Sequence, residues 1–85
     1  MHDRRSSTDI QWESPVYVRI GHGASDAIRS ADDALHYLNL RWPTERGTKY
    51  TLASVACANA VEGRDSPENA REAFVAAAIE ALILA

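Results

Sequence analysis

This chain of 85 residues lacks most of the features that identify a protein class at first reading. Its single cysteine excludes an internal disulfide. Residues 2–5 are polar, and no apolar run of the kind found in secretory signals follows them. We therefore expect a cytoplasmic protein.

Long apolar runs and an excess of positive charge are also missing. The most apolar stretch, residues 73–85, includes Glu80 and is shorter than the roughly twenty residues that a membrane-spanning helix needs. The formal net charge of −3 gives no general attraction to nucleic acid or to anionic lipid. These absences argue against both a membrane and a nucleic acid as a partner.

No set of side chains suggests catalysis or metal binding. The three histidines, His2, His22 and His36, lack the spacing of metal ligands and have no cysteine or carboxylate arranged beside them. Cys57 has no neighbouring cation or histidine in the sequence to lower its pKa, so we expect a small buried hydrophobic residue. We predict no catalytic residue, no metal and no cofactor, and an enzyme is the least favoured class.

Arg71 is the single cation in the last predicted helix, where it lies among Glu68, Glu72 and Glu80. Such a helix would repel phosphate, which argues against a DNA-reading helix-turn-helix. We expect Arg71 to form surface ion pairs with Glu68 or Glu72, or with the carboxyl groups around Glu62, and such pairs contribute little to stability.

The composition that remains is that of a globular domain, with 46% hydrophobic and 25% charged residues. Residues 1–11 are too polar to join a core and are predicted to form a flexible arm. Trp12 is the first residue expected to anchor on the fold. The sequence therefore predicts one domain over residues 12–85.

A β-hairpin is predicted at the start of this domain. Alternating apolar and polar residues indicate a strand over residues 15–20. Gly21 and Gly23 then permit a turn, because glycine adopts positive φ without strain. Residues 24–29 can return as an antiparallel strand with Ile28 toward the core.

A hydroxyl and a carboxylate mark the start of the first predicted helix. Ser30 followed by Asp33 is a variant of the capping box, in which side-chain oxygens accept from free amide groups. Pro43 disfavours helical geometry at Trp42, so this helix is expected to end near Arg41.

Two more helices complete the predicted fold. The second covers residues 48–62, and its apolar residues occupy so much of its circumference that we expect it to be the central, mostly buried helix. The third begins at Ser66 and Pro67 and runs to about Leu82. The short link between them predicts an antiparallel pair. The predicted fold class is α+β, a two-stranded antiparallel hairpin followed by three helices.

The third helix is predicted to be apolar on two sides, one of which faces the core. Four residues at helical spacing form the second apolar stripe: Val75, Ile79, Leu82 and Ile83. This stripe and an unpaired hairpin edge predict a symmetric homodimer. The alternative is a monomer in which Ile10 and Trp12 fold back over the stripe.

A cationic loop precedes the second helix, whose free amide groups favour anions. Five residues make up a candidate anion site: Arg41, Arg46, Gly47, Thr48 and Lys49. The alternative is structural, with Trp42 and Tyr50 closing the end of the core and the charged residues forming a solvated rim. In that case Glu45 can supply the anion at the helix start.

The spacing of several residue groups resembles a family of small bacterial proteins known as domain of unknown function nine-eight-two. The resemblance extends from Trp12 to about Ala81 and matches Leu82 to Ala85 least well. It rests on these residues: Pro15, Val16, Val18, Ile28, Ser30, Ala34, Leu38, Trp42, Pro43, Arg46, Gly47, Tyr50, Ala56, Cys57, Ala60, Glu62, Gly63, Ser66, Pro67, Ala70, Arg71, Ala73 and Phe74. The family has no assigned activity, so the resemblance implies no catalytic or binding role.

Two functions follow from the residues alone. The first is a small cytoplasmic protein-interaction or regulatory module that acts as a homodimer, with a further protein partner unidentified. The alternative is a sensor of small anions or metabolites that uses the Arg46-Gly47 loop at the start of the central helix.

Overall fold

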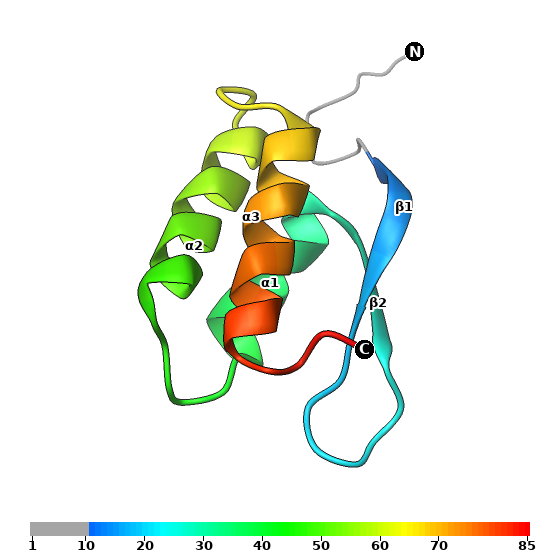
Figure 1. Cartoon of the computed structure of the whole chain (residues 1–85). Coiled ribbons are helices and arrows are strands. Elements are labelled where there is room, and N and C mark those ends of the chain that lie inside the picture. The colour runs from blue at the N-terminus through cyan, green and yellow to red at the C-terminus, as the bar shows by residue number, and fades with distance from the viewer. Residues whose placement is uncertain (1–10) are drawn as a thin grey trace.

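The structure is a computed structural model that describes residues 11–85. Five elements follow one another along the chain: β1 (Gln11–Val18), β2 (Asp26–Ser30), α1 (Ala31–Leu40), α2 (Thr48–Val61) and α3 (Pro67–Glu80). This is the predicted α+β order, a hairpin followed by three helices (Figure 1). The predicted arm lies outside the described residues except for Gln11, which begins β1.

The hairpin is antiparallel, and its register is regular where both strands are buried. Val16 lies opposite Ile28 and Val18 opposite Asp26, whereas the register shifts between Gln11 and Val16. The predicted strand over residues 15–20 is displaced toward the N-terminus, because β1 includes the irregular stretch that contains Pro15. Proline has no amide hydrogen to contribute to a ladder, so an irregular stretch accommodates it.

The start of α1 confirms the predicted cap. The Ser30 hydroxyl accepts from the Asp33 amide at 3.2 Å, and the Asp33 carboxylate accepts from the Arg29 amide at 3.2 Å. The helix is followed by its C-cap, Arg41, as the proline at position 43 predicts. Ser66 caps α3 in the same way, accepting from the Asn69 amide at 3.0 Å.

Aromatic side chains from five segments meet in the core. Phe74 of α3 is fully buried, with its ring centroid 6.1 Å from that of Trp12 and 5.7 Å from that of Trp42. Trp42 also contacts Tyr37 and Tyr50 through its ring. Trp12 therefore anchors β1 on the core.

The central helix is α3, and the prediction that α2 holds this place is wrong. In Figure 1, α3 stands between α2 and the hairpin, and it packs against α2, β1 and α1. The buried residues of α2 are Ala53, Cys57 and Ala60, whereas Leu52 and Val55 are about half exposed. Periodicity cannot tell which apolar face of a helix is buried when apolar residues occupy most of its circumference. The predicted antiparallel pairing of α2 with α3 is confirmed.

The C-terminal residues turn back and lie along β1. Arg19 donates its amide to the Ile83 carbonyl at 2.8 Å, and Ala85 donates to the Tyr17 carbonyl at 2.9 Å. Val18 and Leu84 form an antiparallel bridge. The end of β1 is therefore covered by this chain itself, and β2 is the strand without a second neighbour in the described part of the chain.

Candidate functional site

Leu82 has an unusual backbone conformation at the end of α3. Its φ is 61°, which makes it the single non-glycine residue with positive φ in the part of the chain that the structure describes. The Leu82 amide donates to the Ile79 carbonyl at 3.1 Å, and the Ile83 amide donates to the Ala78 carbonyl at 3.0 Å. These two bonds define a Schellman motif, in which the left-handed position is usually glycine.

The end of α2 has the same motif with glycine at the left-handed position. Gly63 has a φ of 81° and donates to the Ala60 carbonyl at 3.1 Å, while Arg64 donates to the Asn59 carbonyl at 2.8 Å. The hydrogen bonds match those at the end of α3, so Gly63 and Leu82 occupy equivalent positions. A left-handed conformation costs a residue with a Cβ about 1–2 kcal/mol, and Leu82 carries that strain where glycine would not.

Among the residues that the structure describes, the strained leucine is also the most exposed large apolar side chain. Leu82 is 89% exposed, Ile79 is 55% exposed and Leu84 is 42% exposed. Ile79 lies in the last turn of α3, and Leu82 and Leu84 follow the helix; we call these three residues, which lie within six positions in sequence, the C-terminal patch. The Leu82 side chain therefore buries little surface in the monomer, too little to offset its backbone strain.

The predicted interface stripe is only partly present as an exposed surface. Helix α3 ends at Glu80, before the stripe is complete, and Ile83 is 5% exposed because the chain reverses direction at Leu82. Val75 is partly buried and packs against the core. Ile79 and Leu82 therefore remain as the exposed members of the predicted set, and Leu84 joins them.

The start of α2 already has a carboxylate. The Glu80 side chain accepts from the Lys49 amide at 3.1 Å, and a Cβ added to Gly47 would lie 2.6 Å from the same oxygen. The expectation that Glu45 supplies the anion is wrong, because antiparallel packing brings the end of α3 beside the start of α2. An external anion would have to compete with Glu80 for the free amide groups.

The residues of the predicted anion site are divided between two surfaces. Arg46, Gly47 and Glu80 line one hollow, and Arg41 lines another with Asp26 and Tyr37. The Arg46 guanidinium lies 4.8 Å from the centre of the Tyr50 ring, a cation–π arrangement. Thr48 and Lys49 are exposed in the first turn of α2. Anion binding by this loop stays a prediction.

Arg41 has intramolecular partners of its own. Its guanidinium lies 5.3 Å from the centre of the Tyr37 ring and 3.5 Å from the Asp26 carboxylate. The Tyr37 hydroxyl donates to Asp26 at 3.3 Å. Burial, followed by the charge of Asp26, raises the pKa of Tyr37.

Cys57 is fully buried, and burial raises the pKa of its thiol to about 12. Across residues 11–85, no cluster of three or more His, Cys, Asp or Glu side chains is placed to hold a metal ion. None of the helices in this range combines the length and apolarity needed to cross a bilayer.

The fold and its surface define a small α+β protein with a strained, exposed apolar residue at the end of its central helix. The chain belongs to the family described as "Protein of unknown function (DUF982)", which matches residues 14–85. The match includes the last four residues, which resembled the family least in the sequence, so the C-terminal patch lies within the family domain. No curated protein and no solved structure matches the chain.

Two functional features were missed by sequence reasoning. Leu82 belonged to the predicted stripe, but its left-handed conformation had no signal because leucine does not mark a helix end. Arg71 donates its Nε to the Ser14 carbonyl at 2.9 Å, so its hydrogen-bond partner is main chain on β1 and not the predicted Glu68 or Glu72. The two residues are 57 positions apart, so local sequence spacing cannot predict the contact.

Proposed function

We propose that this protein is a small cytoplasmic protein-interaction module that acts as a homodimer through its C-terminal patch. The observation that supports the proposal is Leu82, a leucine 89% exposed at a position with φ of 61°. Strained residues persist where function or the surrounding structure requires them. Burial by a partner gives the Leu82 side chain a role that the monomer does not.

The expected energy is large enough to control association. Full burial of a leucine side chain contributes about 2 kcal/mol. A symmetric interface contains each residue twice, so loss of both copies of Leu82 weakens the dimer by about 4 kcal/mol, roughly a thousandfold in Kd. The dimer still has to offset the loss of rotational and translational freedom, which favours contributions from Ile79 and Leu84 as well.

Light scattering of the protein eluted from a sizing column tests the proposal. The wild type is expected to approach the mass of two chains at high micromolar concentration, and Leu82→Asp is expected to stay at the mass of one. Leu40→Asp is the matched control, since Leu40 is 79% exposed, lies on α1 and does not belong to the C-terminal patch. A wild-type protein that remains a monomer, or equal loss of the dimer in both variants, refutes the proposed role of the patch.

The alternative function, a sensor of small anions or metabolites at the Arg46-Gly47 loop, has weaker support. The Lys49 amide is already bonded to Glu80, and Arg46 lies over Tyr50. The sensor hypothesis requires phosphate or nucleotides to raise the melting temperature, and requires Arg46→Ala to abolish that rise. No rise across a panel of anions counts against it.

A further inference from the structure

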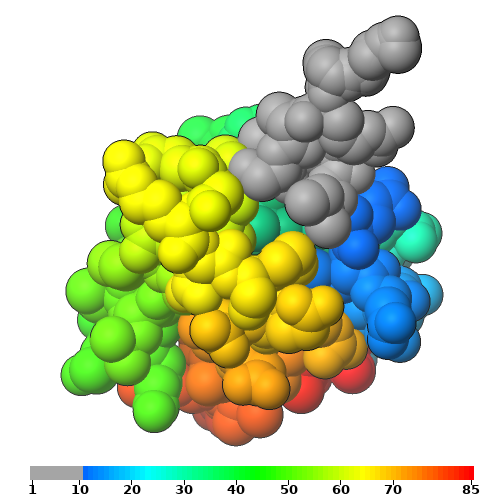
Figure 2. Space-filling view, turned by 90° about the horizontal axis from the view of Figure 1, so that it is seen from above, coloured from blue at the N-terminus to red at the C-terminus, as the bar shows by residue number. Residues whose placement is uncertain are grey.

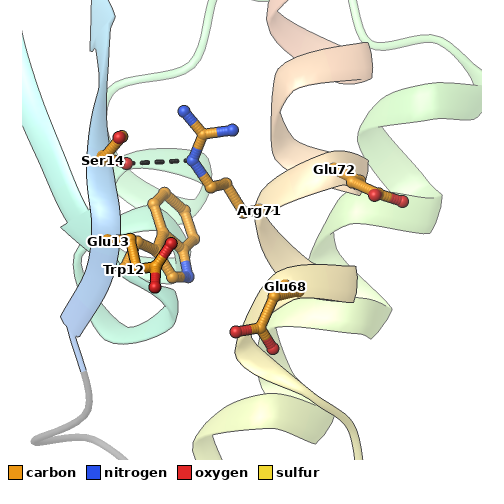
Figure 3. Close-up of a pocket in the computed structure, with 6 residues that line it drawn as sticks. All are labelled: Trp12, Glu13, Ser14, Glu68, Arg71 and Glu72. Carbon is orange, nitrogen blue, oxygen red and sulfur yellow. Dashed lines mark hydrogen bonds between the residues drawn. The ribbon is translucent and has the colours of Figure 1, made fainter.

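A cleft between β1 and the first turns of α3 has the features of a second binding site. Figure 2, viewed from above, shows β1 in blue beside the start of α3 in yellow and orange, so the cleft lies at the opposite end of α3 from the C-terminal patch. Its volume is about 250 Å³. Figure 3 shows the residues that line it: Trp12, Glu13, Ser14, Glu68, Arg71 and Glu72.

The indole nitrogen of Trp12 is a buried donor with no acceptor in the described part of the chain. The Trp12 residue is 7% exposed, and its ring packs against Phe74. In Figure 3 the nitrogen lies on the side of the ring that faces the start of α3, where Glu68 projects. A buried donor without a partner is destabilising, and such groups are rare in native proteins unless a water or a ligand satisfies them.

Arg71 forms the other polar end of the cleft. Its Nε donates to the Ser14 carbonyl at 2.9 Å, which ties α3 to β1 and fixes the guanidinium in place. Figure 3 shows the two terminal nitrogens beyond this bond, directed away from Trp12. The wall therefore holds donors at Trp12 and Arg71.

The charge of the lining residues is negative overall. Three carboxylates, Glu13, Glu68 and Glu72, outnumber the single guanidinium of Arg71, which gives a formal charge of −2. A phosphate or another free anion would be repelled. A cationic group is attracted, and an acceptor attached to it can satisfy the Trp12 nitrogen.

The volume of the cleft limits the size of the ligand that it can hold. Pockets for drug-sized molecules span about 300–1,000 Å³, so a cleft of about 250 Å³ suits one residue of a peptide and not a nucleotide cofactor. We propose that this cleft binds a lysine or arginine side chain together with its adjoining peptide group. The cation lies between Glu13 and Glu68, and the peptide carbonyl accepts from Trp12 Nε1. This site does not depend on the proposed homodimer.

Nuclear magnetic resonance of the indole groups tests the proposal directly. The chain has two tryptophans, so a spectrum of ¹⁵N-labelled protein contains two indole N–H peaks, which Trp12→Phe and Trp42→Phe assign. The probe is Nα-acetyl-lysine N-methylamide, with the norleucine analogue as its uncharged control. The lysine probe is expected to move the Trp12 peak in a saturable way and to leave the Trp42 peak in place.

Substitution of exposed carboxylates gives a second test that does not disturb the core. Glu68→Gln is expected to weaken binding of the lysine probe about two- to fivefold, the scale of an exposed ion pair. Glu45→Gln is the matched control, because Glu45 is exposed in the loop before α2. A Trp12 peak that does not respond to the lysine probe overturns the proposal, and so does an equal response to the norleucine probe.

A double variant tests whether the cation comes from this chain or from a partner protein. Residues 1–10 contain Arg4 and Arg5, and Arg4→Ala/Arg5→Ala removes both charges from the full chain. If these arginines supply the ligand, the Trp12 peak of the variant differs from that of the wild type before any probe is added, and the variant binds the lysine probe more tightly. If a partner protein supplies it, the two proteins have the same Trp12 peak and the same affinity for the probe.

Discussion

Replacing Leu82 with glycine is expected to stabilise the folded monomer. The left-handed backbone at this residue, with φ of 61°, costs leucine about 1–2 kcal/mol that glycine does not incur. The side chain is 89% exposed, so its removal sacrifices little buried area. Glycine gains freedom in the unfolded chain, which offsets about 0.4–1 kcal/mol of this benefit. The free energy of unfolding should therefore rise by about 0.5–1 kcal/mol.

Urea unfolding followed by tryptophan fluorescence measures this change, since both Trp12 and Trp42 are buried. The experiment is done at low protein concentration, because association would stabilise the wild type by mass action. In a domain of this size the expected gain corresponds to a rise in Tm of about 2–8 °C.

Gly63→Leu is the mirror of this variant at the end of α2. A Cβ added at Gly63 meets no atom within 4 Å, so the cost of leucine there is conformational and not steric. Leucine also restricts the unfolded chain, which offsets part of this cost, so the free energy of unfolding should fall by about 0.5–1 kcal/mol.

A Leu82→Gly variant that loses more than about 1 kcal/mol would refute the reasoning, because the side chain would then contribute to the monomer itself. The expected result has two parts of opposite sign, a more stable monomer and a weaker dimer. A purely structural role for Leu82 cannot produce both.

Other contacts give three further predictions. Glu80→Ala should lower the free energy of unfolding by about 0.5–1 kcal/mol, because it removes the hydrogen bond to the Lys49 amide at the start of α2. Gly47→Ala should destabilise the wild type, in which the added Cβ meets Glu80, but should cost much less in a protein that already carries Glu80→Ala. A double-mutant cycle in urea measures this non-additivity. Burial raises the pKa of the Cys57 thiol to about 12, so very little of it is ionised at pH 8. Ellman's reagent should therefore react with Cys57 only after urea unfolds the chain. Rapid reaction of the native protein would contradict this prediction. Because the pKa of Tyr37 is raised in the folded protein, the unfolded chain loses the phenolic proton first as pH rises past 10.0. The contribution of Tyr37 to the free energy of unfolding should therefore be retained below that pH and be lost above it. The free energy of unfolding of Tyr37→Phe should fall less steeply with pH, and equal slopes would contradict the role of Tyr37.

The ends of the helices show how much of the fold is local. Ser30 caps α1 and Ser66 caps α3, each at its predicted position, and Gly63 follows α2 in a left-handed conformation. These features depend on hydrogen bonds between residues three to five positions apart, which the sequence contains in full. The same reasoning placed the end of α3 too late, because leucine at position 82 gives no stop signal.

The candidate sites depend on contacts that local patterns do not contain. Sequence reasoning named Leu82 as an interface residue, but it placed Ile83 on the same surface, and the structure buries Ile83. It identified the start of α2 as attractive to anions but did not find Glu80, which lies 31 residues from its partner Lys49. The cleft beside Trp12 was not foreseen, because it forms only when β1 and α3 meet.

The sequence by itself determined the class of the fold, the order of its elements, the caps of α1 and α3 and the antiparallel pairing of α2 with α3. Only the tertiary structure decided that α3 is central, that the C-terminus covers the end of β1 and that Leu82 projects into solvent. The physical reason is range. Caps and periodicity act within one or two helical turns, whereas the direction of the chain after α3 is fixed by the burial of Ile83 and by hydrogen bonds to a strand more than sixty residues away in sequence.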